Sequence, residues 1–452
     1  MSSSRKLPIG IQDFEKLRLG GNIYVDKTTY IYRLVNTDTP YFLSRPRRFG
    51  KSLFLSTLKS YFLGKKSLFS GLALSELEKD WLEYPVIYLD LNKASYQEPQ
   101  TLNNVLDEIL KLHEREWAMT NIASELSLRF DNLIKTAYQK SGLKVVVLVD
   151  EYDKPLVNTL DKLEVNESMR EILKGFYGIL KSADAYLRFV FLTGVTKFSK
   201  VSVFSDLNNL MDISLDAEFS GICGISETEL TQYFEPEIKK LSEQMKLSYD
   251  GTLEKLKKYY NGYHFCEESE GIYNPFSLLN TFRSVKFRNY WFSTGTPTFL
   301  VKMLRDGNFE IPDLENNIHV SVSDITNYKA GLNNPVPILY QSGYLTIKDY
   351  DTEFSEFILG FPNEEVKYGF LNELLPAYAP PYAVHQQFSA VSFIKTLRTG
   401  NIASFMDTLR AFYASIPYDM LNKDSQQERY YQFIFYLLVT LMGQFIQTEV
   451  KT

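Results

Sequence analysis

A chain of 452 residues is too long for one compact core, so we expect two to four domains. Hydrophobic residues make up 44% and charged residues 23% of the chain, and the formal net charge of −6 argues against a protein coated uniformly with nucleic acid. Two cysteines, Cys223 and Cys266, and four histidines cannot supply a disulfide framework or a zinc site of ordinary spacing, so we expect buried thiols and a cytoplasmic protein.

The first part of the chain, residues 1–222, alternates short apolar strands with amphipathic helical stretches. The expected strands are rich in β-branched and aromatic residues and nearly free of internal polarity, and they cover residues 41–44, 86–91, 145–150, 189–193 and 211–215. Helical stretches such as 52–62, 102–113 and 169–183 lie between them. This alternation predicts an α/β core with a parallel sheet and right-handed crossovers.

A candidate phosphate-binding loop follows the first strand. A triphosphate needs a concave row of backbone N–H groups, a helix N-terminus and a cation. Gly50 lets the backbone come close, Lys51 would reach the β- and γ-phosphates, and Ser52 would give its hydroxyl to Mg²⁺. The nucleotide-binding residues that we expect are Arg45, Pro46, Arg47, Arg48, Phe49, Gly50, Lys51, Ser52 and Leu53.

The loop departs from the usual motif at its first position, where Arg45 stands in place of glycine. Pro46 also stiffens a turn that is usually flexible. A Gly-Lys-Ser sequence alone is weak evidence, and an ordinary strand–turn–helix with a capping serine is the alternative. Here the tripeptide lies between a buried type of strand and a helix, which is the context that a phosphate site requires.

A second candidate motif is the apolar strand that ends in Asp150 and Glu151. Asp150 would hold a water on Mg²⁺, and Glu151 would polarise the attacking water. The separation of about a hundred residues from Ser52 leaves room for one more strand, as in the additional-strand class of P-loop ATPases. The next strand ends in Thr193 and Thr196, which compete for the position between the acidic pair and the γ-phosphate.

Several cationic and titratable residues leave two interpretations open. Arg47 and Arg48 would steady a γ-phosphate or a partner, or they are ordinary surface residues. Lys197 and Lys200 follow the fourth strand, where cationic phosphate sensors are found in some P-loop proteins. We interpret His264 as a packed or hydrogen-bonded core histidine rather than a catalytic base.

The second half of the chain has a different pattern. Helical segments dominate residues 223–312, which begin at the capping-box-like pair Ser226 and Glu229 and indicate a helical lid. Within residues 313–380, a helix at 338–342 precedes strand-like runs at 343–348 and 357–363 with a polar turn at 349–353 between them. A helix followed by two short strands indicates a winged-helix-like unit. Residues 381–452 complete the chain with helical segments.

We expect no membrane partner. The polar N-terminus has no signal-peptide core, and the most apolar C-terminal stretch, residues 433–442, is about half the length that a bilayer-spanning helix needs.

The motifs in combination resemble the bacterial AAA-ATPase-like family over nearly the whole chain. The motifs, each numbered at its first residue, are Leu7-Pro-Ile-Gly-Ile-Gln-Asp-Phe, Tyr24-Val-Asp-Lys-Thr, Tyr41-Phe-Leu-Ser-Arg-Pro-Arg-Arg-Phe-Gly-Lys-Ser, Val149-Asp-Glu-Tyr-Asp-Lys-Pro, Gly194-Val-Thr-Lys-Phe, Tyr260-Asn-Gly-Tyr-His-Phe, Tyr273-Asn-Pro-Phe-Ser and Gln341-Ser-Gly-Tyr-Leu-Thr-Ile. The resemblance implies an AAA-like P-loop NTPase core and ATP and Mg²⁺ as cofactors. It also implies that arginine at the first loop position is a familiar variant.

The resemblance further implies a C-terminal nuclease-like domain of the PD-(D/E)XK superfamily. Residues 427–438 look like the first helix of that domain and residues 447–452 like its first strand, and its metal-binding core should lie beyond residue 452. We therefore expect a partial α/β C-terminal segment without nuclease activity. Glu428 is expected to be a solvated helix-face glutamate rather than an accessory carboxylate.

The leading hypothesis is Mg-dependent ATP binding and hydrolysis by a molecular switch. The first alternative is a binding module whose winged-helix-like unit contacts DNA or RNA under the control of ATP. The second is an interaction scaffold for a protein client, with a vestigial nucleotide site. The complete set Lys51, Ser52, Asp150 and Glu151 speaks against the second alternative. The sequence leaves open whether the protein forms an oligomer in which a neighbouring arginine completes the site.

Overall fold

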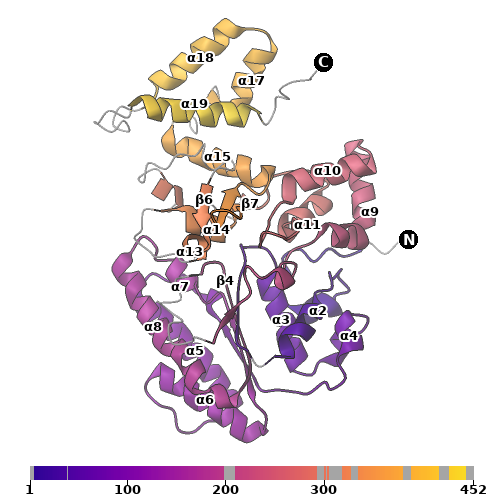
Figure 1. Ribbon diagram of the computed structural model, residues 1–452, viewed down its shortest axis with the longest axis vertical. Coiled ribbons are helices and arrows are strands. Elements are labelled where there is room, and N and C mark those ends of the chain that lie inside the picture. The colour runs from indigo at the N-terminus through magenta and orange to yellow at the C-terminus, as the bar shows by residue number, and fades with distance from the viewer. Residues whose placement is uncertain are drawn as a thin grey trace.

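The computed structural model describes residues 5–37, 39–197, 209–292, 300–301, 303–304, 318–326, 334–379, 388–416 and 427–443. Figure 1 shows the sheet-containing core at one end of the molecule and the C-terminal helices at the other. Lys200 and residues 447–452, which we singled out in the sequence, lie outside the described residues, as does the side chain of Glu428.

The core contains a mixed α/β arrangement around a parallel five-stranded sheet. Its strands are β1 Tyr41–Ser44, β2 Val86–Asp90, β3 Val145–Asp150, β4 Leu187–Gly194 and β5 Met211–Asp212, in the spatial order β2-β3-β4-β1-β5. All neighbouring strands run parallel. The prediction of a parallel sheet is confirmed, and all six residues of β3 are buried, as expected for a strand covered on both faces.

The fifth strand is shorter than the sequence predicts. We expected it to cover residues 211–215, but β5 ends at Asp212. The Asp212 carboxylate accepts the N–H of Ser214 at 2.9 Å, which turns the chain. The Ser214 hydroxyl then accepts the N–H of Ser44 at 2.8 Å, so a side chain takes over the bond that a strand backbone would have made.

Helices cover both faces of the sheet (Figure 1). On one face lie α5 Pro99–Glu116, α6 Leu126–Ser141 and α8 Leu163–Ser182, which pack against one another. The other face carries α1 Phe14–Leu19, α2 Thr28–Val35, α3 Lys51–Phe62 and α4 Ala73–Leu77. The short helix α7 Lys154–Val157 follows β3 at the carboxyl end of the sheet. This end, where β1, β3 and β4 finish together, is where ligands bind in such sheets.

Residues 223–292 form a helical group beside the core. It consists of α9 Glu227–Met245, α10 Tyr249–Tyr260 and α11 Pro275–Ser284, which share a separate buried cluster that includes Phe234 and Tyr260. The capping box at the start of α9 is present, because the Ser226 hydroxyl accepts the N–H of Glu229 and the Glu229 carboxylate accepts the N–H of Ser226. The same carboxylate lies 2.6 Å from Lys27 Nζ, which fastens α9 to the core.

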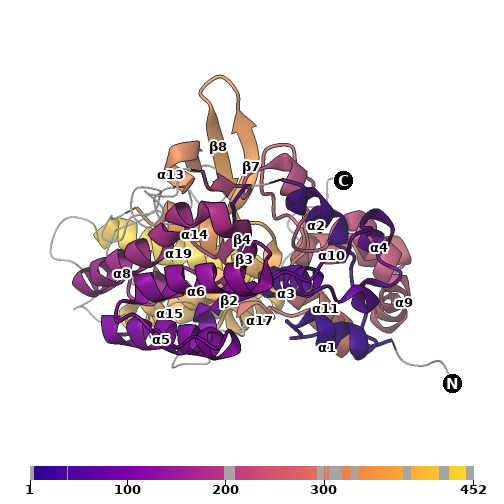
Figure 2. The ribbon, with the colours of Figure 1, turned by 90° about the horizontal axis from the view of Figure 1, so that it is seen from below.

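The next part of the chain contains a three-stranded antiparallel sheet in the order β6-β8-β7. Its strands are β6 Ile318–Ser321, β7 Thr346–Asp351 and β8 Glu356–Gly360, and its helices are α13 Val322–Thr326, α14 Val336–Ser342 and α15 Glu364–Tyr378. Figure 2 shows the β7–β8 hairpin projecting from the body of the molecule. The turn that we placed at 349–353 begins only after Asp351, because its carboxylate accepts the N–H groups of Glu353 and Phe354.

The C-terminal helices are α17 Ala390–Arg398, α18 Ile402–Ala414 and α19 Gln427–Gly443. Helix α19 packs on α15 and α17, and the rings of Tyr378 and Phe433 meet at 4.6 Å. None of the helices in the described ranges combines the length and apolar character that a bilayer-spanning segment needs.

Candidate functional site

The loop between β1 and α3 has the geometry of an anion-binding turn. Gly50 is the N-cap of α3 and has φ 99°, a left-handed conformation that side chains with a Cβ rarely adopt. Arg48 also has a positive φ, of 71°. The loop thereby aims the N-terminus of the twelve-residue helix α3 at the carboxyl end of the sheet.

Lys51 is buried, and its amine is held at the mouth of this loop. Lys51 Nζ donates to the carbonyl oxygen of Arg45 at 3.0 Å and lies 3.4 Å from that of Pro46. It also lies 3.4 Å from Glu151 Oε1, with both side chains largely shielded from solvent. These carbonyl and carboxylate partners hold the Lys51 amine at a fixed place beside the loop.

The side chain of Arg45 points away from the anion-binding side of the loop. Its guanidinium donates to the carbonyl oxygens of Ser214 at 2.7 Å and Phe219 at 3.0 Å, and it lies 4.0 Å from the ring centroid of Phe265. Burial lowers the pKa of this guanidinium, which is 1% exposed. Arg45 and Pro46 line a small separate cavity of about 30 Å³ behind the loop, so Arg45 fastens the loop to the β5 side of the core.

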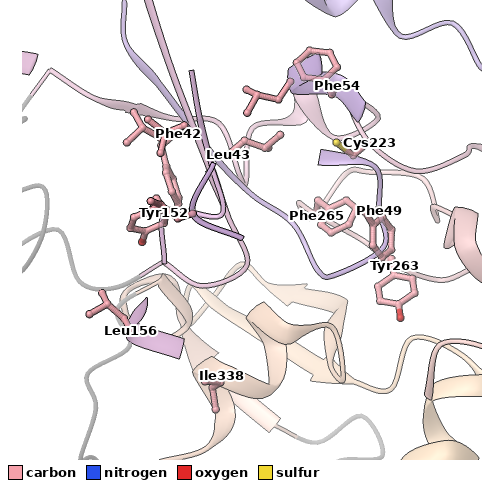
Figure 3. Packing of buried hydrophobic residues seen from close by; sticks show 14 of the residues in the cluster. Phe42, Leu43, Phe49, Phe54, Tyr152, Leu156, Cys223, Tyr263, Phe265 and Ile338 are labelled. Atoms are coloured by element: carbon pink, nitrogen blue, oxygen red, sulfur yellow. The ribbon is translucent and has the colours of Figure 1, made fainter. Parts of the chain in front are cut away.

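The rest of the loop contacts the aromatic turn that the sequence singled out. The ring of Phe49 meets Tyr263 edge-on at 4.7 Å and Phe265 at 5.6 Å, as Figure 3 shows. The Phe49 carbonyl accepts the N–H of Gly224 at 3.0 Å, and the guanidinium of Arg48 lies 4.6 Å from the Phe276 ring. The phosphate loop is therefore in direct contact with the helical group.

Asp150 and Glu151 stand opposite the loop at the end of β3. Asp150 is buried, and burial, with the nearby charge of Glu151, raises the pKa of its carboxyl group. Hydroxyls of Ser52 and Thr193 oppose this rise, and Thr193 Oγ1 donates to Asp150 Oδ1 at 2.8 Å. Glu151 has φ 53°, a left-handed conformation that is strained for glutamate and that turns its carboxylate toward Lys51.

The structure distinguishes the two threonines at the end of β4. Thr193 bonds the Asp150 carboxylate and thereby lies beside the acidic pair. Thr196 is fully buried, and within the described ranges its hydroxyl has no hydrogen-bond partner. Its backbone N–H donates to Asp153 Oδ2 at 2.5 Å.

Asp153 is a residue that our sequence reasoning missed. It is fully buried, and its carboxylate accepts the N–H groups of Val195 and Thr196, which follow β4. Burial and the charge of Glu151 raise the pKa of Asp153 to about 7. A Cβ on Gly194 would lie 2.7 Å from the Tyr152 ring and 2.6 Å from the Asp153 carboxylate, so the backbone of Gly194 packs closely against both side chains. The available signal was a third acid three residues after Asp150.

The β1–α3 loop, Glu151, Asp153 and the helical group enclose one large cavity of about 380 Å³. Its loop side is lined by Arg47, Arg48, Phe49, Gly50, Lys51, Ser52, Leu53, Glu151 and Asp153. Its other side is largely apolar and is lined by Pro8, Ile9, Ile11, Ile23, Val25, Phe234, Phe276 and Leu279, which the sequence reasoning did not assign to the site. An apolar compartment joined to a cationic, hydroxyl-bearing one has the chemistry that a nucleotide requires.

Of the remaining candidates, Cys223 lines the large cavity, whereas Lys197, His264 and Cys266 do not. Lys197 lines the small cavity, forms an ion pair with Asp212, and donates its N–H to the Gln341 side chain at 2.9 Å. The interpretation of His264 is confirmed, because its Nδ1 lies 2.7 Å from the Ser269 carbonyl oxygen and burial lowers its pKa. Cys223 and Cys266 are buried, free thiols.

The first strand of the parallel sheet runs through a Gly-Lys-Ser turn into a helix, and an Asp-Glu pair follows a buried strand that is separated from it by β4. This arrangement is consistent with the P-loop-like AAA fold. Residues 8–204 match the family described as "Predicted AAA-ATPase". The whole chain is also similar to an "Uncharacterized protein in vnfD 5'region" of Azotobacter chroococcum mcd 1. The two are 38% identical over 457 aligned positions, which cover 100% of this chain and 86% of the relative. The chain belongs to this AAA-ATPase-like family.

Proposed function

We propose that the protein binds Mg·ATP in the large cavity, hydrolyses it, and acts as a nucleotide-dependent molecular switch. One observation carries the proposal. Lys51, Ser52 and Glu151 line the loop side of one cavity, and the Asp150 carboxyl is hydrogen-bonded to Ser52 and Thr193 beside them. The family's description as a predicted ATPase supports the same function.

The oxygen donors present suit a magnesium ion. The Ser52 hydroxyl and the Asp150 carboxylate face each other, and Mg²⁺ prefers such oxygens and keeps waters and phosphates as its other ligands. Within the described ranges, no group of three His, Cys, Asp or Glu side chains lies close enough to hold a metal alone, which fits an ion held jointly with a nucleotide. When bound, Mg²⁺ would supply charge neutralisation at the phosphates.

The residues have separate roles in the proposed hydrolysis. The N–H groups of residues 47–52 and the Lys51 ammonium hold the β- and γ-phosphates. Glu151 accepts a proton from a water whose oxygen bonds to the γ-phosphorus, while the bond between that phosphorus and the β,γ-bridging oxygen breaks. The products are ADP, inorganic phosphate and the proton. Thr193 holds the Asp150 carboxylate in its orientation.

We assign the adenosine end of the ligand to the apolar side of the cavity. There the N-terminal segment, residues 8–12, faces α11 of the helical group, and Arg48 lies over the Phe276 ring. A ligand in this position would contact the core and residues 223–292 together. We therefore propose that residues 223–312 act as a lid whose position depends on the nucleotide.

We propose that residues 313–380 form a winged-helix-like unit. The contacts of its described residues, 318–326 and 334–379, favour a response to the state of the β1–α3 loop over nucleic-acid binding. Its helix α14 is largely buried, and at its C-cap a Cβ on Gly343 would lie 2.6 Å from Pro46 of the phosphate loop. A helix held in this way is not free to enter a DNA groove. The exposed hairpin carries Asp349, Asp351, Glu353 and Glu356, which would repel phosphates.

Steady-state ATP hydrolysis with Mg²⁺ tests the proposal, with Lys51→Ala and Glu151→Gln beside the wild type. We expect Lys51→Ala to lose both nucleotide binding and turnover. Glu151→Gln should keep binding and lose turnover by about 10²-fold or more, because it removes only the proton acceptor. A wild-type protein that binds no ATP would contradict the proposal. Binding without turnover would leave a nucleotide-gated binding module.

A further inference from the structure

One cationic side chain that lines the large cavity comes from outside the β1–α3 loop and has no role in the proposed hydrolysis so far. Five cationic residues line it, namely Lys27, Arg47, Arg48, Lys51 and Lys154. Lys27 is committed to the Glu229 carboxylate and the Gly221 carbonyl, and Arg48 lies over the Phe276 ring. Among the described residues, no ion pair or side-chain hydrogen bond occupies the amine of Lys154 or the guanidinium of Arg47.

Lys154 lines the cavity from α7, whereas Arg47 belongs to the loop between β1 and α3. It is the first residue of α7, and its backbone N–H donates to the carbonyl oxygen of Glu151 at 3.0 Å. Val157, three residues further on, lines the same cavity, so this face of α7 is turned toward it. The half-buried lysine is thus carried by the turn that carries Glu151.

The turn that holds Lys154 is fixed at several points. The N–H of Tyr152 donates to the Thr193 carbonyl at 2.9 Å, and the Tyr152 hydroxyl donates to the Thr196 carbonyl at 2.9 Å. The Asp153 carboxylate holds the N–H groups of the segment after β4. These bonds join the turn after β3 to the end of β4, so Lys154 starts from a defined backbone position.

The position of Glu151 determines which phosphate Lys154 would meet. In the proposed hydrolysis, the water held by Glu151 attacks from the side of the γ-phosphorus that is opposite to the leaving ADP. A cation on the same turn would meet the γ-phosphate oxygens from the side of Glu151. Lys51, which comes from the loop, meets the β- and γ-phosphates from the other side.

Charge at this end of the cavity also favours a further cation. The carboxyl groups of Glu151 and Asp153 line the cavity, and the charge of Glu151 acts on both Asp150 and Asp153. Like charges a few ångströms apart repel strongly in a site shielded from water. Lys51 already lies near Glu151, so a second ammonium would offset the charge that the γ-phosphate brings.

We propose that Lys154 binds the γ-phosphate of ATP and stabilises the charge on its oxygens during transfer, a function that other ATPases obtain from an arginine of a neighbouring subunit. This inference rests on the proposed ATPase function. Lys154 thereby makes the site distinguish ATP from ADP, because the lysine has no phosphate partner once the γ-phosphate has left.

Calorimetric titration of ATP and ADP, together with ATP turnover, tests this role in Lys154→Ala and Lys154→Arg. We expect Lys154→Ala to weaken ATP binding about tenfold, to leave ADP binding within about twofold, and to slow turnover about 10²-fold. Lys154→Arg keeps the charge and should recover most of the preference for ATP. Lys144→Ala removes an exposed lysine at the other end of β3 and should change nothing.

Each outcome separates this inference from the proposed function. If Lys154→Ala keeps wild-type turnover and preference for ATP while Lys51→Ala is inactive, the assignment of Lys154 is wrong and the ATPase stands. If Lys154→Ala weakens ATP and ADP binding equally, the lysine has a structural role and the assignment is again wrong. If the wild-type protein binds neither nucleotide, both proposals are overturned.

Discussion

Replacing Glu365 by glutamine should make the protein more stable above neutral pH. Glu365 lies in the first turn of α15 and is 1% exposed, and its carboxylate accepts the N–H of Trp291 at 2.9 Å. Burial raises the pKa of this carboxyl from 4.5 to about 7. The folded state therefore binds the proton more tightly than the unfolded state, and stability is lost as the pH rises from 4.5 to about 7.

The size of the effect follows from the pKa difference. A shift of about 2.5 pH units at about 1.4 kcal/mol per unit corresponds to about 3 kcal/mol of stability, present at pH 4.5 and lost by pH 8. Glutamine cannot ionise, and its amide oxygen can still accept the N–H of Trp291. Glu365→Gln should therefore exceed the wild type by up to about 3 kcal/mol at pH 8 and by little at pH 5.

Urea denaturation at pH 5, 6, 7 and 8 measures the difference between the two proteins. The matched control is Glu364→Gln, because Glu364 is adjacent and forms a surface ion pair with Lys258 at 2.8 Å. Loss of that pair should cost less than about 1 kcal/mol at every pH. If Glu365→Gln were less stable than the wild type by a constant amount from pH 5 to 8, Glu365 would be ionised in the fold and the reasoning would be refuted.

Two further substitutions test the framework around the site. Gly194→Ala would bring a Cβ to 2.6 Å from the Asp153 carboxylate and 2.7 Å from the Tyr152 ring. It should therefore lower the free energy of unfolding, measured in urea, by about 1–3 kcal/mol. Unchanged stability would show that these two side chains move aside at little cost. Arg45→Ala would leave the carbonyls of Ser214 and Phe219 without their donor, and should cost about 3–5 kcal/mol. Arg45→Lys is the control for this variant. Equal stability of the wild type, Arg45→Ala and Arg45→Lys would contradict the conclusion that the Arg45 guanidinium fastens the loop to the core.

The sheet was predictable because buried parallel strands have a distinctive composition. Strand β3 is entirely apolar until Asp150, and its complete burial explains why its limits were predicted correctly. The end of β5 was not predictable, since it depends on two side-chain hydrogen bonds. Asp212 accepts the N–H of Ser214 two residues further on, and the Ser214 hydroxyl accepts the N–H of Ser44 at the end of β1. A pattern of hydrophobic residues cannot predict where a side-chain hydrogen bond replaces a backbone bond of the strand.

The candidate site could be proposed from the sequence only where one short segment carries its residues. Lys51 and Asp150 belong to compact motifs, so their residue types and spacing sufficed to propose them. Asp153 and Lys154 stand in the same motif as Asp150, but their residue types alone suggested no role, because their positions depend on the turn that brings them to the end of β4 and into the cavity. The apolar side of the cavity combines residues 8–12 with Phe276, which are distant in sequence and meet only in the fold.

The hydrogen bonds by which Arg45 fastens its loop to the core limit which sequence changes the family can tolerate at this position. In a glycine-type loop, the first position contributes little beyond backbone shape, and the loop is a self-contained unit. Here the guanidinium depends on carbonyls near residues 214 and 219 and on the ring of Phe265. A transplant of residues 41–52 into another ATPase would carry a buried charge without its acceptors. The loop therefore depends on residues that are distant in the sequence. We expect natural changes at position 45 to be accompanied by changes at position 265.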